Sequence, residues 1–138
     1  MSRNADAWPP PDALRLSEIT VEEAKATLRA TFNLLECWKL SGSEALQLLG
    51  QPDPETYQRW KAGQVADLSQ DMACRLGHLL SIHAALRRLF AEPERGYAWI
   101  RKPNAAFGGR SALDRMLAGA PGDLFAVRAY LDGELDGW

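Results

Sequence analysis

The residues best suited to chemistry are two cysteines and two histidines, and their spacing does not define a reactive site. Cys74 and His78 lie four positions apart, which would place two metal ligands on one face of a helix. No third or fourth ligand follows nearby, so we interpret the pair as a buried cysteine and an incidental histidine. His83 lies on an apolar helical stripe, a position typical of a core or surface histidine. The sequence therefore predicts no metal site.

The glycine pair Gly108-Gly109 invites comparison with a phosphate-binding loop. Such a loop needs a preceding strand and a following Lys-Ser/Thr pair, and neither is found beside these glycines. No nucleophile lies next to a base in a recognisable context. We therefore expect no catalytic residue and no cofactor, and the chain is not predicted to be an enzyme.

A second chemical possibility is DNA recognition by a short polar helix. Asp53 and Pro54 are typical of a helix start and Gly63 of its end, while Gly50 ends another short helix just before it. Two short helices joined by a glycine-bearing turn favour a helix-turn-helix motif, whose second helix enters the major groove. Arginine and glutamine read guanine and adenine, and lysine contacts phosphate. The predicted DNA-binding residues are Thr56, Gln58, Arg59 and Lys61.

The charge balance argues against phosphate contacts as the main source of affinity. The net charge is −2, whereas domains that bind nucleic acid through phosphates are usually strongly basic. Acidic residues also outnumber basic ones around the predicted recognition helix. Operator binding is thus a secondary expectation.

The stretch from Tyr97 to Trp138 holds half of the aromatic residues of the chain. Its first part is basic, and the sign then reverses at Asp132, Glu134 and Asp136. Aromatic side chains supply contact area. We interpret residues 97–131 as a small folded platform and residues 132–138 as a segment that contacts a partner.

The elements that carry these residues are all predicted to be helical. Thr20 and Glu23 form a capping box before a helix that ends near Leu40, and Ser43 is expected to cap the short helix that follows. Ser69 caps a longer helix that Glu92-Pro93 ends. Further short helices follow, at residues 94–100 and 111–118. The last helix, residues 124–131, is expected to start at Asp123 as its N-cap and to end before Gly133 frees the final residues. No strand is predicted, so the expected fold class is all-α.

Composition suggests how the chain is organised. Its 138 residues, 46% hydrophobic and 25% charged, fit an ordinary globular protein. We expect a flexible arm at residues 1–16, which include Trp8-Pro9-Pro10-Pro11, a helix-turn-helix domain at 17–92 and a binding domain at 93–138. Cys37 and Cys74 are expected to be reduced and buried. Without a signal peptide or a membrane-spanning run, a cytoplasmic location is expected.

An ordered set of residues in the last third of the chain resembles the toxin-binding domain of the Xre/MbcA/ParS antitoxin family. Residues 59–63 and 75–90 also resemble the Xre-like helix-turn-helix half of that family, and the first 16 residues are unmatched. The C-terminal pieces are Trp99, Pro103-Asn104, Phe107-Gly108-Gly109, Ser111-Ala112-Leu113-Asp114, Asp123-Leu124, Val127, Tyr130-Leu131 and Gly137-Trp138.

The resemblance implies an antitoxin of a type II toxin–antitoxin pair. The partner is typically a RES-domain toxin that degrades NAD or transfers ADP-ribose from it, and the C-terminal segment of the antitoxin covers the NAD pocket. Such complexes commonly repress their own operon through the N-terminal domain. The resemblance and the apolar helices together suggest a homodimer. The low basicity of the helix-turn-helix half departs from this pattern.

The residues of the C-terminal segment fit that implied role. An NAD pocket should have basic and apolar walls, and a carboxylate-rich tail with a tryptophan complements them. We therefore predict that the tail enters or caps the pocket and that residues 99–107 shape the module presenting it. The alternative for Trp99, Phe107 and Tyr130 is that they form the core of this module. The predicted toxin-binding residues are Trp99, Arg101, Asn104, Phe107, Asp132, Glu134, Asp136, Gly137 and Trp138.

A second function class remains open beside the antitoxin. The chain could be a stand-alone helix-turn-helix repressor whose C-terminal module only mediates dimerisation. A neighbouring gene for a RES-type toxin would favour the antitoxin, and its absence would favour the repressor. An enzyme is the third and least favoured class, because no catalytic constellation is visible.

Overall fold

The computed structural model describes residues 20–66 and 68–136. The predicted arm, residues 1–16, lies outside this range. Within it the chain forms helices, and an isolated antiparallel bridge joins Pro103 to Ser111. The all-α prediction is confirmed. In chain order the elements are α2 (Val21–Cys37), α3 (Gly42–Leu48), α4 (Pro54–Lys61), α5 (Gln70–Leu89), α6 (Pro93–Trp99), the 3-10 turn η2 (Ala105–Phe107), α7 (Ala112–Leu117) and α8 (Pro121–Asp136).

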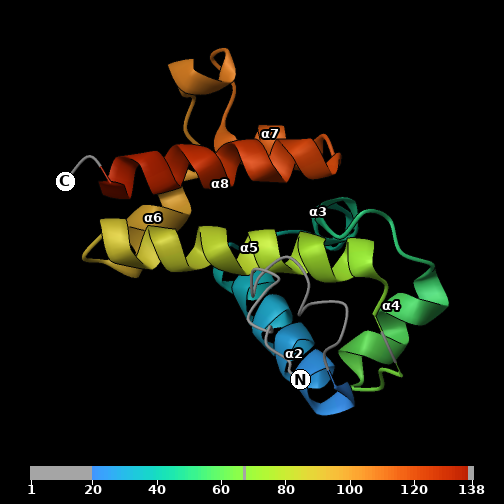
Figure 1. Cartoon of the computed structure of the whole chain (residues 1–138). Coiled ribbons are helices and arrows are strands. Elements are labelled where there is room, and N and C mark those ends of the chain that lie inside the picture. The colour runs from blue at the N-terminus through green and yellow to red at the C-terminus, as the bar shows by residue number, and fades with distance from the viewer. Residues whose placement is uncertain (1–19, 67, 137–138) are drawn as a thin grey trace, which may run out of the picture.

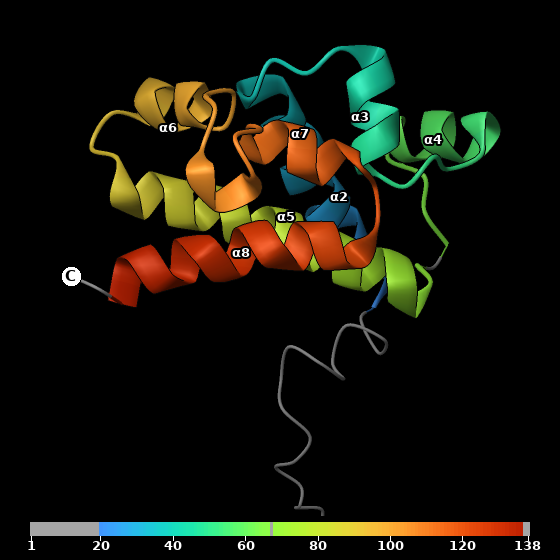
Figure 2. The ribbon, with the colours of Figure 1, turned by 90° about the horizontal axis from the view of Figure 1, so that it is seen from above.

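Helix α5 lies at the centre of the molecule. Figures 1 and 2 show α8 beside it and running in the same direction, so that the C-terminal ends of both helices lie at the same end of the protein. Helix α2 crosses α5 on another side, and α4 lies at the periphery next to α2 (Figure 1). The segment that contains η2 projects beyond α8.

One continuous hydrophobic core joins the helices around α5. Leu76, Leu79 and Ile82 of α5 are fully buried. They belong to the same cluster as Leu34 of α2 and Leu124 of α8. The core therefore spans the expected unit of residues 17–92 and the expected unit of residues 93–138.

Side-chain caps fix where most helices begin. The capping box of Thr20 and Glu23 is confirmed, with both reciprocal hydrogen bonds formed. The expectation that Ser43 caps α3 is wrong. Ser41 caps it and forms a second capping box with Glu44, because only Ser41 has a glutamate three residues later. Asp53 caps α4, as predicted.

Two expectations about α8 are wrong. Asp123 is not its N-cap: the carboxylate accepts hydrogen bonds from the Ala120 backbone N–H at 3.2 Å and from Arg115 Nε at 2.7 Å. The helix also continues through Gly133 to Asp136. Glycine in a helix interior costs about 1 kcal/mol relative to alanine, and the packing of Leu135 against the core opposes this cost.

The prediction that both cysteines are buried is also wrong. Cys37 and Cys74 are each partly exposed, and neither forms a disulfide. Both cysteines lie at the edge of the apolar stripe of their helix, and solvent still reaches their side chains there.

Two arginines hold distant parts of the chain together by donating to backbone carbonyl groups. Arg75 of α5 donates to Leu48 O at the end of α3, at 3.3 Å, and to Gly119 O just before α8, at 2.9 Å. Arg101 donates to Trp38 O and Lys39 O at the end of α2, both at 3.0 Å. The last carbonyl groups of a helix lack partners within the helix. Each guanidinium therefore supplies hydrogen bonds that the local chain cannot.

Candidate functional site

The C-terminal half is organised around an aromatic cluster. The ring of Trp99, from α6, stacks on that of Tyr130, from α8, with centroids 6.0 Å apart and planes inclined by 9°. Phe107 meets Tyr130 edge to face at 5.4 Å, and Phe90 lies 6.4 Å from Trp99. Phe107 is 8% exposed, whereas Trp99 and Tyr130 are half-buried. Phe107 is therefore part of the core of this half, and Trp99 and Tyr130 keep part of their rings at the surface.

A shallow groove lies beside the exposed parts of these rings. It holds about 190 Å³ and runs between the end of α5 and the last turns of α8. Its lining is aromatic and aliphatic apart from one carboxylate, that of Glu134. The lining residues are Leu89, Phe90, Trp99, Tyr130, Leu131 and Glu134. This groove, called here the C-terminal groove, contains two of the predicted toxin-binding residues, Trp99 and Glu134.

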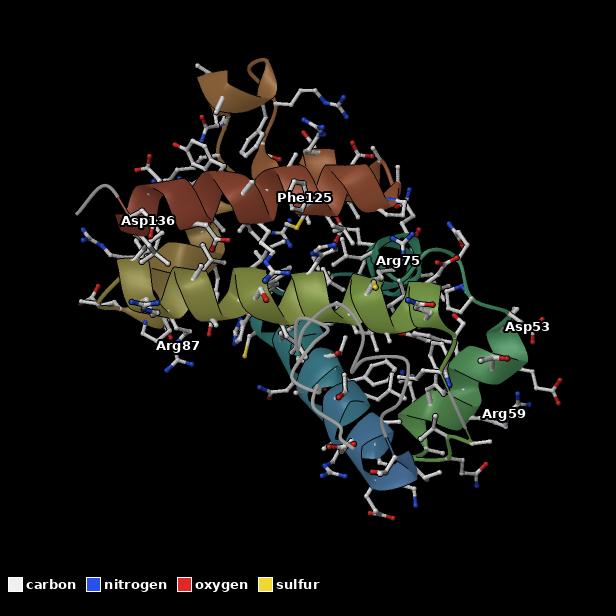
Figure 3. The ribbon with its side chains drawn as sticks, in the orientation of Figure 1. Asp53, Arg59, Arg75, Arg87, Phe125 and Asp136 are labelled. Atoms are coloured by element: carbon white, nitrogen blue, oxygen red, sulfur yellow. The ribbon has the colours of Figure 1, made fainter. Side chains whose placement is uncertain are left out.

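The carboxylates at the C-terminal end of α8 destabilise that helix in the unbound chain. The C-terminus of a helix carries a partial negative charge and favours cations. The last turn of α8 has no basic residue and contains Glu134 and Asp136, both exposed. Asp132 lies 3.9 Å from Arg128. The parallel arrangement places the negative end of α5 at the same end of the molecule (Figure 3, Arg87 and Asp136). The last turn of α5 carries Arg87 and Arg88, whose positive charges are favourable at a helix C-terminus. Two exposed carboxylates therefore add to the partial negative charge of the helix ends here.

Asn104 holds the projecting loop in shape. Its side-chain Oδ1 accepts a hydrogen bond from Ala106 N at 2.9 Å, and its backbone N–H donates to Arg110 O at 3.0 Å. Gly108 and Gly109 complete the turn with φ of 68° and 86°, which other residues adopt only with strain. The structure therefore shows Asn104 as an organiser of the loop, and its predicted contact with a toxin stays a prediction. Gly137 and Trp138 lie outside the described residues.

Arg101 is engaged within the chain, although its sequence position suggested a toxin contact. We expect Arg101→Ala to lower the stability of the unbound protein by about 1–3 kcal/mol, because two carbonyl groups lose a charged donor. Urea unfolding of this variant and of Lys102→Ala, a neighbouring exposed cation, measures the effect. Equal stability of the two variants would contradict the capping role.

Sequence reasoning missed Phe125 of α8, a large hydrophobic side chain that is 57% exposed. It lies on α8 (Figure 3), with its ring edge to face with His78 of α5 at 5.9 Å. Its position was readable in principle, because Phe125 lies off the stripe formed by Leu124, Val127 and Leu131. His78 Nδ1 also lies 3.2 Å from Arg128 Nη1. Burial, then the charges of Arg128 and Arg75, lower the pKa of His78.

His83 joins three helices. Trp38 Nε1 donates to His83 Nδ1 at 3.2 Å, and the imidazole stacks on Tyr97 with centroids 5.8 Å apart. This hydrogen bond needs an unprotonated Nδ1. Burial, and then the charge of Arg87, lower the pKa of His83 below 6.5. His83, which is half-buried, therefore has a structural role between these helices.

The lowered pKa of His83 predicts a loss of stability in mild acid. Below about pH 6.5 the unfolded chain binds a proton at this residue that the folded chain resists, so the free energy of unfolding falls as pH falls. Thermal unfolding between pH 7.5 and 5.5 should show a falling Tm. His83→Gln should reduce this slope more than Arg88→Ala, an exposed control. An unchanged slope in His83→Gln would contradict the assignment.

The predicted DNA-binding residues lie on α4, which carries no buried residue. Gln58 and Lys61 are exposed, and Lys61 Nζ lies 5.6 Å from the centre of the Tyr57 ring. Arg59, labelled in Figure 3, lies 3.8 Å from Glu55 and donates to Thr56 Oγ1 at 3.3 Å. A DNA contact by Arg59 would have to compete with these partners. No group of three or more potential metal ligands occurs within residues 20–66 and 68–136.

Comparison with known proteins shows the family of this chain. Residues 85–137 match the family model of the antitoxin Xre/MbcA/ParS C-terminal toxin-binding domain. The uncharacterized protein y4oB of Sinorhizobium fredii is 45% identical over 112 residues, which cover 81% of this chain and 86% of that protein. No solved structure matches the chain.

The chain belongs to the Xre/MbcA/ParS antitoxin family, and its C-terminal part is a toxin-binding domain. The resemblance noted from the sequence is confirmed. The matched range begins in the last turns of α5 and takes in α6, α7 and α8. It therefore contains the aromatic cluster and the C-terminal groove. A toxin is thus the partner that this domain implies. None of the described helices is long and apolar enough to cross a membrane.

Proposed function

We propose that this antitoxin neutralises a RES-domain toxin by placing the C-terminal end of α8 over its NAD pocket. The observation that carries the proposal is the position of Glu134 and Asp136 in the last turn of α8, at its negative end, where Glu134 also lines the C-terminal groove. A pocket that holds a pyrophosphate must present cations. Those cations would favour the carboxylates that the helix dipole disfavours.

The aromatic groove supplies the second part of this proposed interface. Half-buried tryptophan and tyrosine side chains are enriched among residues that dominate binding energy. Trp99 and Tyr130 stack on each other, and both line the groove. They would contact apolar surface around the pocket while the carboxylates meet its basic wall. In this role the chain acts by binding and not by catalysis.

Co-purification with the toxin of a neighbouring gene, followed by an NAD-consumption assay, tests the proposal. The antitoxin should bind the toxin and stop NAD consumption at equimolar ratio. A toxin that binds the antitoxin but continues to consume NAD would remove the pocket-covering role. A partner that does not consume NAD would remove the RES assignment.

We also propose that the complex represses its own operon through α4. The geometry that supports this role is the exposed position of Gln58 and Lys61 on a peripheral helix. Because one such helix gives few contacts, binding would require two copies of the chain on a palindromic site. The second candidate, a stand-alone repressor that dimerises through its C-terminal module, is supported by the exposed Phe125.

An electrophoretic shift on the upstream promoter tests DNA binding. We expect Arg59→Ala to weaken the shift by about 10-fold, since one arginine contact to a base edge contributes roughly 1–3 kcal/mol. Lys102→Ala, in the other half of the protein, serves as the matched control. If the wild-type protein gives no shift at moderate salt, the repressor role is removed while the antitoxin role stands.

A further inference from the structure

Helix α4 packs incompletely against the body, and this leaves a hollowed surface between α4 and α2. No side chain of α4 is fully buried, and its aromatic residues Tyr57 and Trp60 are half-exposed. A groove of about 350 Å³ lies between α4 and α2, with Leu28, Phe32 and Trp60 in its lining. Two further hollows share residues with it and extend it along α2. Together they form what is called here the α2–α4 groove.

The rim of this groove is basic. Lys25, Arg29 and Lys61 line it, against the single carboxylate of Glu36 in the same hollow. One of its extensions reaches Val21, which is 45% exposed in the first turn of α2. The groove therefore offers aromatic and aliphatic surface with a positive border, and it begins where the preceding part of the chain enters α2. Such a surface fits an extended, apolar and acidic segment.

The first 19 residues contain a segment with this chemistry. Residues 4–14 read Asn-Ala-Asp-Ala-Trp-Pro-Pro-Pro-Asp-Ala-Leu, with aspartates at 6 and 12 and no lysine or arginine. Proline-rich segments bind aromatic-lined grooves at low entropic cost, because the proline backbone is restricted before binding. Trp8, between the two aspartates, supplies a large side chain for the space beside Phe32 and Trp60.

The length of the connection permits this contact. Residues 12–19, when extended, span about 27 Å. The rise of α2 from Val21 to Glu36 is about 22 Å. Residues 6–11 can thus reach any part of the α2–α4 groove from the start of α2. The short connection also gives a high effective concentration, on the order of millimolar.

We propose that the segment Asp6–Asp12 of this same chain binds in the α2–α4 groove, with Trp8 against Phe32 and Trp60 and the aspartates at the basic rim. This contact would complete the packing of α4 and hold the helix that carries the predicted DNA-binding residues. It does not depend on the identity of the toxin.

Amide hydrogen exchange of the full chain tests the proposal. Trp8→Ala should increase exchange in α4 by about fivefold, because α4 opens more readily without its cover. Exchange in α7 and α8 should not change. Arg3→Ala, outside the segment, is the matched control in the arm and should leave α4 as in the wild type. Unchanged exchange of α4 in Trp8→Ala would overturn the proposal.

A second test changes the basic rim of the groove instead of the segment. Arg29→Glu should also increase exchange in α4, whereas Arg88→Glu, the same charge change at the far end of α5, should not. Measurement at several protein concentrations separates the two possible occupants. Protection of α4 that is independent of concentration supports the segment of the same chain. Protection that increases with concentration assigns the groove to a second copy and overturns the proposal.

Discussion

Replacing Glu134 and Asp136 with glutamine and asparagine is expected to weaken toxin binding by about 100-fold, because loss of a desolvated charge contact at an interface costs roughly 2–5 kcal/mol. The same double variant should make the unbound antitoxin more stable by about 1 kcal/mol, since each carboxylate at a helix C-terminus costs roughly 0.3–1 kcal/mol. A variant that binds the toxin more weakly but is more stable when unbound shows that the carboxylates serve binding and not folding.

Calorimetric titration with the toxin and thermal unfolding of the unbound chain measure the two effects. Glu22→Gln is the matched control: this exposed carboxylate lies in the first turn of α2, where the helix dipole favours it. This control should slightly lower the Tm and leave toxin affinity unchanged. If Glu134→Gln with Asp136→Asn binds the toxin as tightly as the wild type, the C-terminal end of α8 is not the contact surface.

Arg75→Ala is expected to cause the largest loss of stability among the single polar substitutions considered, about 2–4 kcal/mol. The guanidinium is partly buried, which lowers its pKa, and nearby Asp71 opposes that shift. Its removal leaves the carbonyl groups of Leu48 and Gly119 without their charged donor. A short charged bond such as that to Gly119 contributes roughly 1.5–3 kcal/mol, and the longer bond to Leu48 contributes less. Urea unfolding measures the loss, with Arg88→Ala as the exposed control.

A double-mutant cycle with Gly50 tests whether Arg75 acts through the end of α3. A Cβ atom at Gly50 would lie 2.9 Å from Arg75 Nε, and φ of +80° adds strain for any other residue. Gly50→Ala should therefore destabilise the wild type more than it destabilises Arg75→Ala. Equal effects in the two backgrounds would mean that Arg75 and the turn after α3 are not coupled.

Local sequence signals predicted the caps of α2, α4 and α5 but not the starts of α3 and α8. Thr20 with Glu23 and Asp53 with Pro54 act within one turn of chain, and each predicted cap of this kind forms. The competition between Ser41 and Ser43 could also have been decided from the sequence, because Glu44 stands at the correct distance from Ser41 alone.

Long-range contacts explain what the sequence did not predict. Gly133 is a reasonable helix terminator until Leu135 is known to pack on the core. Arg101 is a reasonable surface cation until its carbonyl partners, more than sixty residues earlier in the chain, are seen. The parallel pairing of α5 with α8, which forms the C-terminal groove, likewise depends on residues far apart in sequence. The aromatic and acidic composition of the site was predictable, but its shape was not.

The central position of α5 restricts how toxin specificity can pass from one antitoxin to another. The matched toxin-binding domain begins at residue 85, inside α5, but the residues of α5 that pack in the core begin at Ala73. A gene fusion made at residue 85 would join two halves of a helix whose buried faces come from different parents. A recombinant antitoxin should therefore fold only when α5 and α8 come from the same parent.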